Sequence, residues 1–278
     1  PLLSFCEAKF IACEFSLQNR TLYGVDGEEK EKMKREILDV VFESERLKLG
    51  FTTRFGGVSE GAYESLNLGD HVGDLSANVA KNREILAAAL GIAPFNLKFM
   101  RQIHSNRVEI LRDLEDELLP CDGVITALRG ITLCVLVADC TPVLLSDHDA
   151  GVVAAVHAGR LGARNGIVAR TVDTMVGLGA NPEKIHALLG PSVSGERYEL
   201  PEAMARDVDN HLPGSYCTTL KGTPGVDIRA GLAYQLYTKG VSNIDIDPRC
   251  TIEDPEFFSH RREGVTGRQA GVIWLTEQ

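Results

Sequence analysis

The sequence predicts an α+β domain built from layers of helices and sheets. Strand-like and helix-like segments follow one another without the strict alternation that is typical of a doubly wound parallel sheet. The 278 residues are 44% apolar and 24% charged, which is typical of a globular protein. At this length roughly three-quarters of the unfolded surface can be buried. We expect a main catalytic domain over residues 49–278, preceded by an N-terminal segment, 1–48, that packs on it.

The N-terminal segment contains a highly charged stretch, DGEEKEKMKREILDVVFESERLK. Within it, Met33, Ile37, Val40 and Val41 recur at near-helical spacing. This spacing predicts a helix with one buried stripe. Nothing in the segment indicates a role in function.

Strands are predicted where apolar residues run together, or alternate with polar ones, between turn-forming residues. A strand begins the stretch FTTRFGGVSEGAYESLNLG (51–69) and leads into a loop rich in glycine and serine. Residues 97–111 alternate like two strands around a polar centre. Further strands are expected in the segments ITLCVLVADC, TPVLLSD, GVVAAVHA, KIHALLG and RQAGVIWL.

Helices are predicted over 76–91, over 163–179 and from Asp227 to Gly240. Ser76 is expected to cap the first helix and Gly91 to end it. Apolar residues at helical spacing mark the buried face of each helix. The expected buried residues are, in chain order, Val79, Leu86 and Leu90; Val168, Val172, Met175 and Val176; and Leu232 and Leu236.

The net charge excludes some classes of partner. It is −10, with a pI near 5.2, whereas nucleic acid and anionic membranes require a basic face. The longest apolar run, ITLCVLVADCTPVLL, is interrupted by Asp139 and is too short to span a bilayer. We therefore expect neither nucleic acid nor membrane as a partner. A small anionic substrate stays compatible with this charge, because it needs only a local basic pocket.

The cysteines indicate a reducing compartment. Seven are present, an odd number without a CxxC pair, which argues against a disulfide framework. The first ten residues, PLLSFCEAKF, contain Glu7 and Lys9 and do not resemble a signal peptide. We expect a cytoplasmic protein. The sequence leaves its oligomeric state open.

Three residues that can bind metal or act in catalysis lie at predicted strand ends: His104, Cys140 and His157. If strands 131–137 and 151–157 pair, their polar ends can meet the end of strand 97–103. Two imidazoles and a thiolate suit zinc, and a catalytic zinc site typically keeps one open position. Water at such a position has a pKa near 7.

Other interpretations of these residues stay open. A single cysteine in an apolar strand is usually a small core residue. Without metal, Cys140 is a candidate nucleophile with His157 as its base. A non-enzymatic scaffold is also compatible with the sequence. A multicopper oxidase is disfavoured, because the chain has only seven histidines and no HxH pair.

Candidate substrate-binding residues lie in loops rich in glycine or arginine. After His157, the loop GRLGARNG places Arg160 and Arg164 at a strand-to-helix junction, where backbone N–H groups can bind an anion. The remaining candidates are Arg54 and Asn67 in the loop after the first strand, and His260 and Arg261 in FFSHRREGVTGR. Arginines beside aromatic residues suit a flat, polar or phosphorylated ligand.

Several motifs occur together in one order: TTRFGGVS, SLNLGDHVGD, QIHS, ADCTPVLL, VHAGR, LGPSVSG and FFSHRREGVTGR. From about residue 50 onward the chain thus resembles the YfiH-like family. This family is also called the laccase-domain or multicopper polyphenol oxidase family, and its members are described as purine nucleoside phosphorylases. The resemblance implies a layered α/β/β/α sandwich with mixed sheets, related to the catalytic domain of cytotoxic necrotizing toxins.

The resemblance also implies a metal and a reaction. In the family the histidine of QxH, the cysteine of ADC and the histidine of HAG bind zinc, which correspond to His104, Cys140 and His157; Cu²⁺ is the alternative ion. The implied substrates are phosphate and a purine nucleoside (adenosine, inosine, guanosine or methylthioadenosine), and adenosine deamination is a second activity. Some bacterial relatives suggest the alternative of a metal-free hydrolase of a cell-wall precursor or another amide.

The sequence departs from the family pattern in one motif. HAGRLG replaces the common HAGWRG, so Arg160 and Leu161 stand where Trp and Arg are usual.

Overall fold

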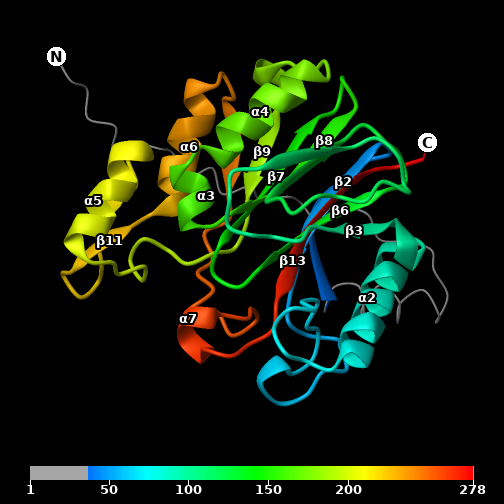
Figure 1. The fold of residues 1–278 in the computed structure, drawn as a ribbon, viewed down its shortest axis with the longest axis horizontal. Coiled ribbons are helices and arrows are strands. Elements are labelled where there is room, and N and C mark those ends of the chain that lie inside the picture. Colours follow the sequence, from blue (N-terminus) through cyan, green and yellow to red (C-terminus); the bar gives the residue numbers. More distant parts are fainter. Residues whose placement is uncertain (1–36, 278) are drawn as a thin grey trace, which may run out of the picture.

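The computed structural model describes residues 37–277, which form two sheets with helices on their outer faces (Figure 1). The five-stranded sheet has the order β1-β2-β13-β6-β3 and the six-stranded sheet the order β12-β9-β7-β8-β5-β4. The strands of the first sheet are β1 (Leu38–Glu43), β2 (Leu47–Thr52), β13 (Gln269–Leu275), β6 (Thr132–Val137) and β3 (Leu97–Phe99). Those of the second are β12 (Asn243–Ile246), β9 (His186–Leu189), β7 (Thr141–Asp147), β8 (Val152–Ala158), β5 (Gly123–Thr126) and β4 (Val108–Leu111).

Most of the helices lie on the two outer faces, and the short helix nearest the C-terminus lies at one end of the sheets (Figure 1). They are α2 (Ser76–Leu90), α3 (Arg160–Arg164), α4 (Ile167–Gly177), α5 (Glu202–His211), α6 (Ile228–Thr238) and α7 (His260–Glu263). Helix α2 packs its buried Leu86 against residues of the five-stranded sheet such as Val272. Helices α4, α5 and α6 share a core with the outer face of the six-stranded sheet. The predicted α+β class and the α/β/β/α layers are confirmed.

The two sheets face each other across a shared apolar core. Within β7, Leu144 points into this core, together with Phe51 and Ile273 of the opposite sheet. Its neighbours Val143 and Leu145 point the other way, toward the helices. This alternation is the period of two that a strand imposes, and here both faces are buried. Such strands read as continuous apolar runs in the sequence.

Strand pairing differs from the prediction in a way that matters for the site. Strand β8 pairs antiparallel with β7, from Thr141 opposite Ala158 to Asp147 opposite Val152. Strand β6 lies in the other sheet, between β13 and β3. The predicted pairing of 131–137 with 151–157 is therefore wrong, because a run that is buried on both faces does not specify its partner. Cys140 lies where the chain crosses from one sheet to the other.

The N-terminal prediction is corrected in part. Residues Leu38–Glu43, which include Val40 and Val41, form strand β1 and pair antiparallel with β2. β-branched residues favour a strand when a partner edge is present, so pairing overrides the helical spacing. Met33 lies outside the described residues. Strand β1 belongs to the same sheet as β13, although it precedes residue 49, and the proposed domain boundary stays a prediction.

The helices predicted over 76–91 and from Asp227 to Gly240 are present, but the one predicted over 163–179 is interrupted, because α3 ends at Arg164, Gly166 has φ +82° and α4 begins at Ile167. Two further corrections concern single residues. The first residue of α2 is Ser76, and Leu75 occupies the capping position without a side-chain bond, so the predicted Ser76 cap is wrong. Val176 is 43% exposed, because a step of one residue from buried Met175 turns the side chain toward solvent. The Asp227 start of α6 is confirmed, since its carboxylate accepts a hydrogen bond from the N–H of Ala230 (3.1 Å).

Several elements were not predicted, above all α5, β5, β12 and the small hairpin of β10 (Tyr216–Thr218) and β11 (Pro224–Val226). The strands among them are only three or four residues long, and α5 is polar except for one buried face that carries Ala205 and Val208, so each offers few apolar residues to recognise. Among residues 37–277, no helix has the length and apolar character needed to cross a membrane.

We expect Leu144→Ala to lower the free energy of unfolding by about 2–5 kcal/mol, because it leaves a cavity between the two sheets. Leu144 is 1% exposed, whereas Leu220 is 60% exposed, which makes Leu220→Ala the matched control. Urea denaturation of both variants measures the difference. A loss below about 0.5 kcal/mol for Leu144→Ala, the level typical of surface substitutions, would contradict this account of the core.

Candidate metal centre

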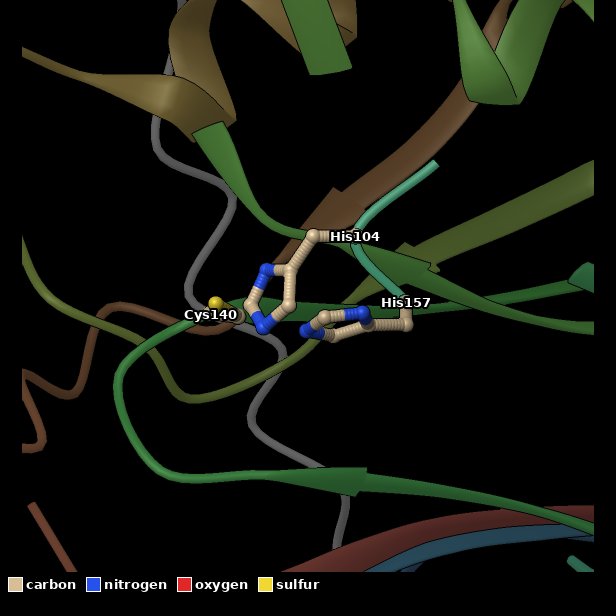
Figure 2. Close-up of side chains that lie close together, drawn as sticks. All are labelled: His104, Cys140 and His157. Carbon is tan, nitrogen blue, oxygen red and sulfur yellow. The ribbon is translucent and has the colours of Figure 1, made fainter. Parts of the chain in front are cut away.

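Three segments bring His104, Cys140 and His157 together (Figure 2). His104 follows β3, Cys140 connects β6 to β7, and His157 lies within β8. Their ligand atoms all lie within 4.8 Å of one another. The two imidazole rings meet edge to face, with centroids 4.7 Å apart. The structure thus joins residues that are separated by up to 53 positions in the sequence, the difference between 157 and 104.

The backbone around these residues adopts unusual conformations. His104 has φ +57° and Asp139, which precedes Cys140, has φ +89°. Residues other than glycine rarely adopt such values, which cost of order 1–3 kcal/mol and cluster at functional sites. Gly159 is also required for close approach, because a Cβ there would lie 2.8 Å from Nδ1 of His104 and 3.1 Å from Sγ of Cys140.

A buried carboxylate, Asp122, orients two of the three side chains. Its Oδ1 lies 2.8 Å from Nδ1 of His157 and accepts the backbone N–H of His104 (2.9 Å). Its Oδ2 accepts the backbone N–H and the hydroxyl of Ser105, both at 2.7 Å. A carboxylate that holds the second nitrogen of a histidine in this way is the usual outer partner of a metal-binding histidine.

The electrostatics of the site follow from burial and from these bonds. Burial acts to raise the pKa of Asp122, but hydrogen bonds from His157 and Ser105 outweigh it and lower the pKa to about 2. Burial acts to lower the pKa of His157, but the negative charge of Cys140 and the bond to Asp122 raise it to about 9. Burial and the charge on His157 lower the pKa of His104. A metal ion therefore competes with protons for this site.

The donor set fits zinc. Tetrahedral zinc with sulfur at about 2.3 Å and nitrogen at about 2.0–2.1 Å requires ligand atoms roughly 3.3–3.6 Å apart. Small side-chain rotations close the present separation, within 4.8 Å, to that range. His157 is buried, Cys140 is half-buried and His104 is exposed, so one side of the group faces solvent. The cluster is therefore accessible from one side.

The predicted substrate residues near α7 take part in bonds within the protein. Arg54 donates to Oε1 of Glu263 at 2.7 Å, and its guanidinium lies 4.5 Å from the ring centre of Phe258. His260 is exposed, and its Nδ1 bonds the carbonyl of Gly264 (2.5 Å). A substrate role for either residue stays a prediction.

Arg261 is fixed close to the metal-binding residues. Its backbone N–H donates to Oδ2 of Asp139 (2.7 Å), the residue directly before Cys140. Its guanidinium lies 4.5 Å from the ring centre of Tyr198 and donates to the carbonyl of Glu199 (3.1 Å). Arg261 is exposed and so accessible to a ligand.

Two arginines after β8, Arg160 and Arg164, have the same predicted role but different surroundings. Arg164 binds Asp207 through two parallel hydrogen bonds, of 2.6 and 2.8 Å. The side chain of Arg160 has no hydrogen bond or ion pair with another described residue, and Arg160 directly follows Gly159. Arg160 is thus the arginine of this loop that is available to a substrate.

Asn67 is completely buried, and its amide is used inside the protein. Its Nδ2 donates to Asp74 (2.9 Å) and to the carbonyl of Gly69, and its Oδ1 accepts the backbone N–H groups of Gly69 and Arg268 (both 2.9 Å). These bonds favour a role in positioning the loop that carries Arg268.

Sequence reasoning missed Asp122, Tyr198 and Arg268. Asp122 stands between Cys121 and Gly123 before a short strand, and its only sequence signal is an acidic residue in an apolar context. Tyr198 lies in a loop without a motif. Arg268 ends the stretch FFSHRREGVTGR, and unlike Arg261 it has no aromatic residue beside it in the sequence.

Comparison with known proteins identifies the family. Residues 48–276 match the family described as multi-copper polyphenol oxidoreductase laccase. The chain belongs to this laccase family. It is 58% identical over 231 residues to a purine nucleoside phosphorylase of Corynebacterium glutamicum, covering 82% of this chain and 94% of that protein. A purine nucleoside phosphorylase of Mycobacterium bovis is 52% identical over 233 residues, covering 84% and 93%.

Solved structures of the laccase family share the fold. The crystal structure of the hypothetical protein YfiH of Bacillus licheniformis superposes with a TM-score of 0.81 at 30% identity. The match covers 87% of this chain and 97% of that one. The predicted membership of the YfiH-like, laccase-domain family is confirmed.

We expect Asp122→Asn to weaken zinc binding by about 10–100-fold, because an amide orients His157 less well and carries no charge. Competition against a chromogenic chelator measures the dissociation constant. Asp207→Asn, which removes a surface carboxylate outside the centre, serves as the control and should leave it unchanged. Equal zinc affinity in wild type and Asp122→Asn would contradict the orienting role.

A second prediction concerns Glu263. Burial acts to raise its pKa, but hydrogen bonds from Thr266, Arg262 and Arg54 lower it from 4.5 to about 2. Because the pKa is lower in the folded state, the stabilisation is complete above pH 4.5 and is lost as the pH falls toward 2. We expect Glu263→Gln to cost about 1 kcal/mol at pH 7, because solvent screens the charge of this exposed carboxylate, and less at pH 3.5, as measured by urea denaturation. A cost that does not change with pH would contradict a stabilising role for the ionised carboxylate of Glu263.

Proposed function

We propose that this chain is a zinc-dependent purine nucleoside phosphorylase of the cytoplasm that also deaminates adenosine. The observation that carries the proposal is the cluster of His104, Cys140 and His157 oriented by Asp122. The phosphorylase names of relatives at 58% and 52% identity support the reaction. Zinc is the ion that the two nitrogens and one sulfur favour, with Cu²⁺ as the alternative.

In phosphorolysis, an oxygen of phosphate bonds to C1′ of the ribose while the bond from C1′ to the purine nitrogen breaks. The products are ribose 1-phosphate and the free base, which takes up a proton. A bound zinc ion supplies Lewis-acid chemistry and lowers the pKa of water. The protein residues hold the reactants in line, which accounts for much of the rate enhancement in such reactions. Asp122 keeps His157 fixed throughout.

The side chains around Cys140 suit a nucleoside. Arg261 and Tyr198 present a stacked cation and ring, which favours contact with a flat base. Arg160 is available on the neighbouring segment. We propose adenosine, inosine, guanosine and methylthioadenosine as substrates, with phosphate as the co-substrate. In the deamination of adenosine, water adds at C6 and ammonia leaves.

One observation favours a second candidate function. Asp122, His157 and Cys140 form a continuous chain of interactions, in the order orienting acid, base and nucleophile. A metal-free hydrolase acting on a cell-wall precursor or another amide would use this arrangement. Such an enzyme would stay active after complete removal of zinc and would be inactivated by alkylation of Cys140.

We expect Cys140→Ala to lose both zinc and activity. Wild type should contain roughly one zinc per chain and convert inosine and phosphate to hypoxanthine and ribose 1-phosphate. The variant should lose the metal, and its activity should fall by more than the roughly 10–100-fold typical of an outer partner. Metal analysis and mass spectrometry of the products provide the readouts.

The matched control is Cys217→Ala. Cys217 is also half-buried, but its thiol donates to the carbonyl of Gly195 and lies outside the cluster. The control should retain zinc and activity. Release of the base at the full rate by zinc-free wild type would contradict the proposed function.

A further inference from the structure

Arg268 is a half-buried arginine without an ion-pair partner among the described residues, and it directly precedes β13, which pairs with the end of β6 that leads to Cys140. We propose that Arg268 binds the phosphate group that enters the metal site. This inference deepens the proposed function and rests on it for the identity of the co-substrate. Neither the sequence motifs nor the comparisons assign Arg268 a role.

The position of Arg268 is fixed from its backbone outward. Its N–H donates to Oδ1 of the completely buried Asn67 (2.9 Å), which Asp74 holds in turn. Its stem packs on Gly69, where a Cβ would lie 2.8 Å from Cγ of Arg268. The side chain therefore leaves the loop in one defined direction.

Part of the guanidinium is anchored and part is available. Nη1 donates to the carbonyls of Thr266 (3.0 Å) and Gly267 (2.8 Å). A guanidinium has five N–H groups, and Nη1 carries two of them. Within the described part of the chain, Nε and Nη2 have no hydrogen-bond partner. Their three N–H groups form the edge that binds two oxygens of a phosphate side by side.

Three other arginines contrast with Arg268. Arg54 and Arg262 both pair with Glu263, and Arg164 pairs with Asp207. Each of these three has a carboxylate to neutralise it. Arg268 has only carbonyl oxygens, although it is less accessible to water than a surface arginine. A buried charge without a counter-ion is unfavourable, so this site favours an incoming anion.

Arg268 directly precedes Gln269, which pairs with Val137 of β6, three residues before Cys140, so its backbone lies beside the segment that leads to the cluster. Burial lowers the pKa of its guanidinium, while the charges of Cys140 and Asp139 act to raise it. In return, its positive charge acts to lower the pKa of His104. Asp139 forms no ion pair with Arg268 in the described part of the chain, because its two oxygens accept from Thr251 and from the backbone of Arg261.

The chemistry of the anion follows from the charges present. A metal ion in the cluster adds positive charge beside Arg268, and the two cations repel each other unless an anion lies between them. A neutral nucleoside cannot supply that charge. Phosphate supplies two negative charges and oxygens at the spacing of the guanidinium fork. The same chemistry would suit inorganic phosphate or the phosphate of a nucleotide.

Calorimetric titration of the zinc-loaded full chain tests the inference without requiring catalysis. Inorganic phosphate should bind wild type, and Arg268→Met should raise the dissociation constant by at least about tenfold, because charged hydrogen bonds are lost. Arg268→Lys, which keeps the charge but not the fork, should fall between the two. Titration with inosine 5′-monophosphate identifies the source: binding that depends on Arg268 and competes with phosphate indicates the phosphate of a nucleotide.

The control variant is Arg83→Met. Arg83 is also partly buried and donates to the carbonyl of Leu68, but it pairs with Asp70. It should leave phosphate binding within about twofold of wild type. Thermal melting of all variants separates a folding defect from a binding defect, and Arg268→Lys keeps the test valid if Arg268→Met does not fold.

The outcomes separate this inference from the proposed function. Equal phosphate affinity in wild type and both Arg268 variants, or binding of neither phosphate nor the nucleotide, overturns the inference. Phosphorolysis by wild type with an unchanged phosphate KM in Arg268→Met also overturns it and leaves the function standing. Phosphate binding that depends on Arg268, in a protein that phosphorolyses no nucleoside, supports the inference and removes the proposed function.

Discussion

The carboxylate of Asp122 is the group on which the geometry of the site depends. It is completely buried, and its charge is balanced by hydrogen bonds from His157 and from the loop of His104 and Ser105. One side chain therefore fixes a strand residue and a loop residue relative to each other. Its cost of burial is offset only while these bonds are intact, so the two histidines are held as a unit.

The position of the third residue of the cluster, Cys140, depends on the layered fold itself. Cys140 lies where the chain passes from the five-stranded to the six-stranded sheet, so both layers must form before it reaches the histidines. The left-handed backbone of Asp139 turns the chain there, and its carboxylate binds Thr251 and the N–H of Arg261. These bonds offset the unfavourable conformation and connect the segment of Cys140 to α7.

The sequence predicts which residues form this cluster better than it predicts the strand pairing and the contacts that hold them in place. Residues at strand ends, together with the family resemblance, predict that His104, Cys140 and His157 come together, as they do in the structure. The start of α6 at Asp227 was also predicted. The pairing of β7 with β8 was missed, because apolar runs buried on both faces carry no register. Asp122 and Arg268 were missed because their importance comes from contacts with residues far away in the sequence.

The central claim is that one sulfur and two imidazole nitrogens bind a single ion. X-ray absorption spectroscopy of the zinc-loaded protein tests it most directly. We predict a first shell with one sulfur at about 2.3 Å, two nitrogens at about 2.0–2.1 Å and one further light atom. A shell that contains only oxygen and nitrogen, or that includes two or more sulfurs, would contradict the account.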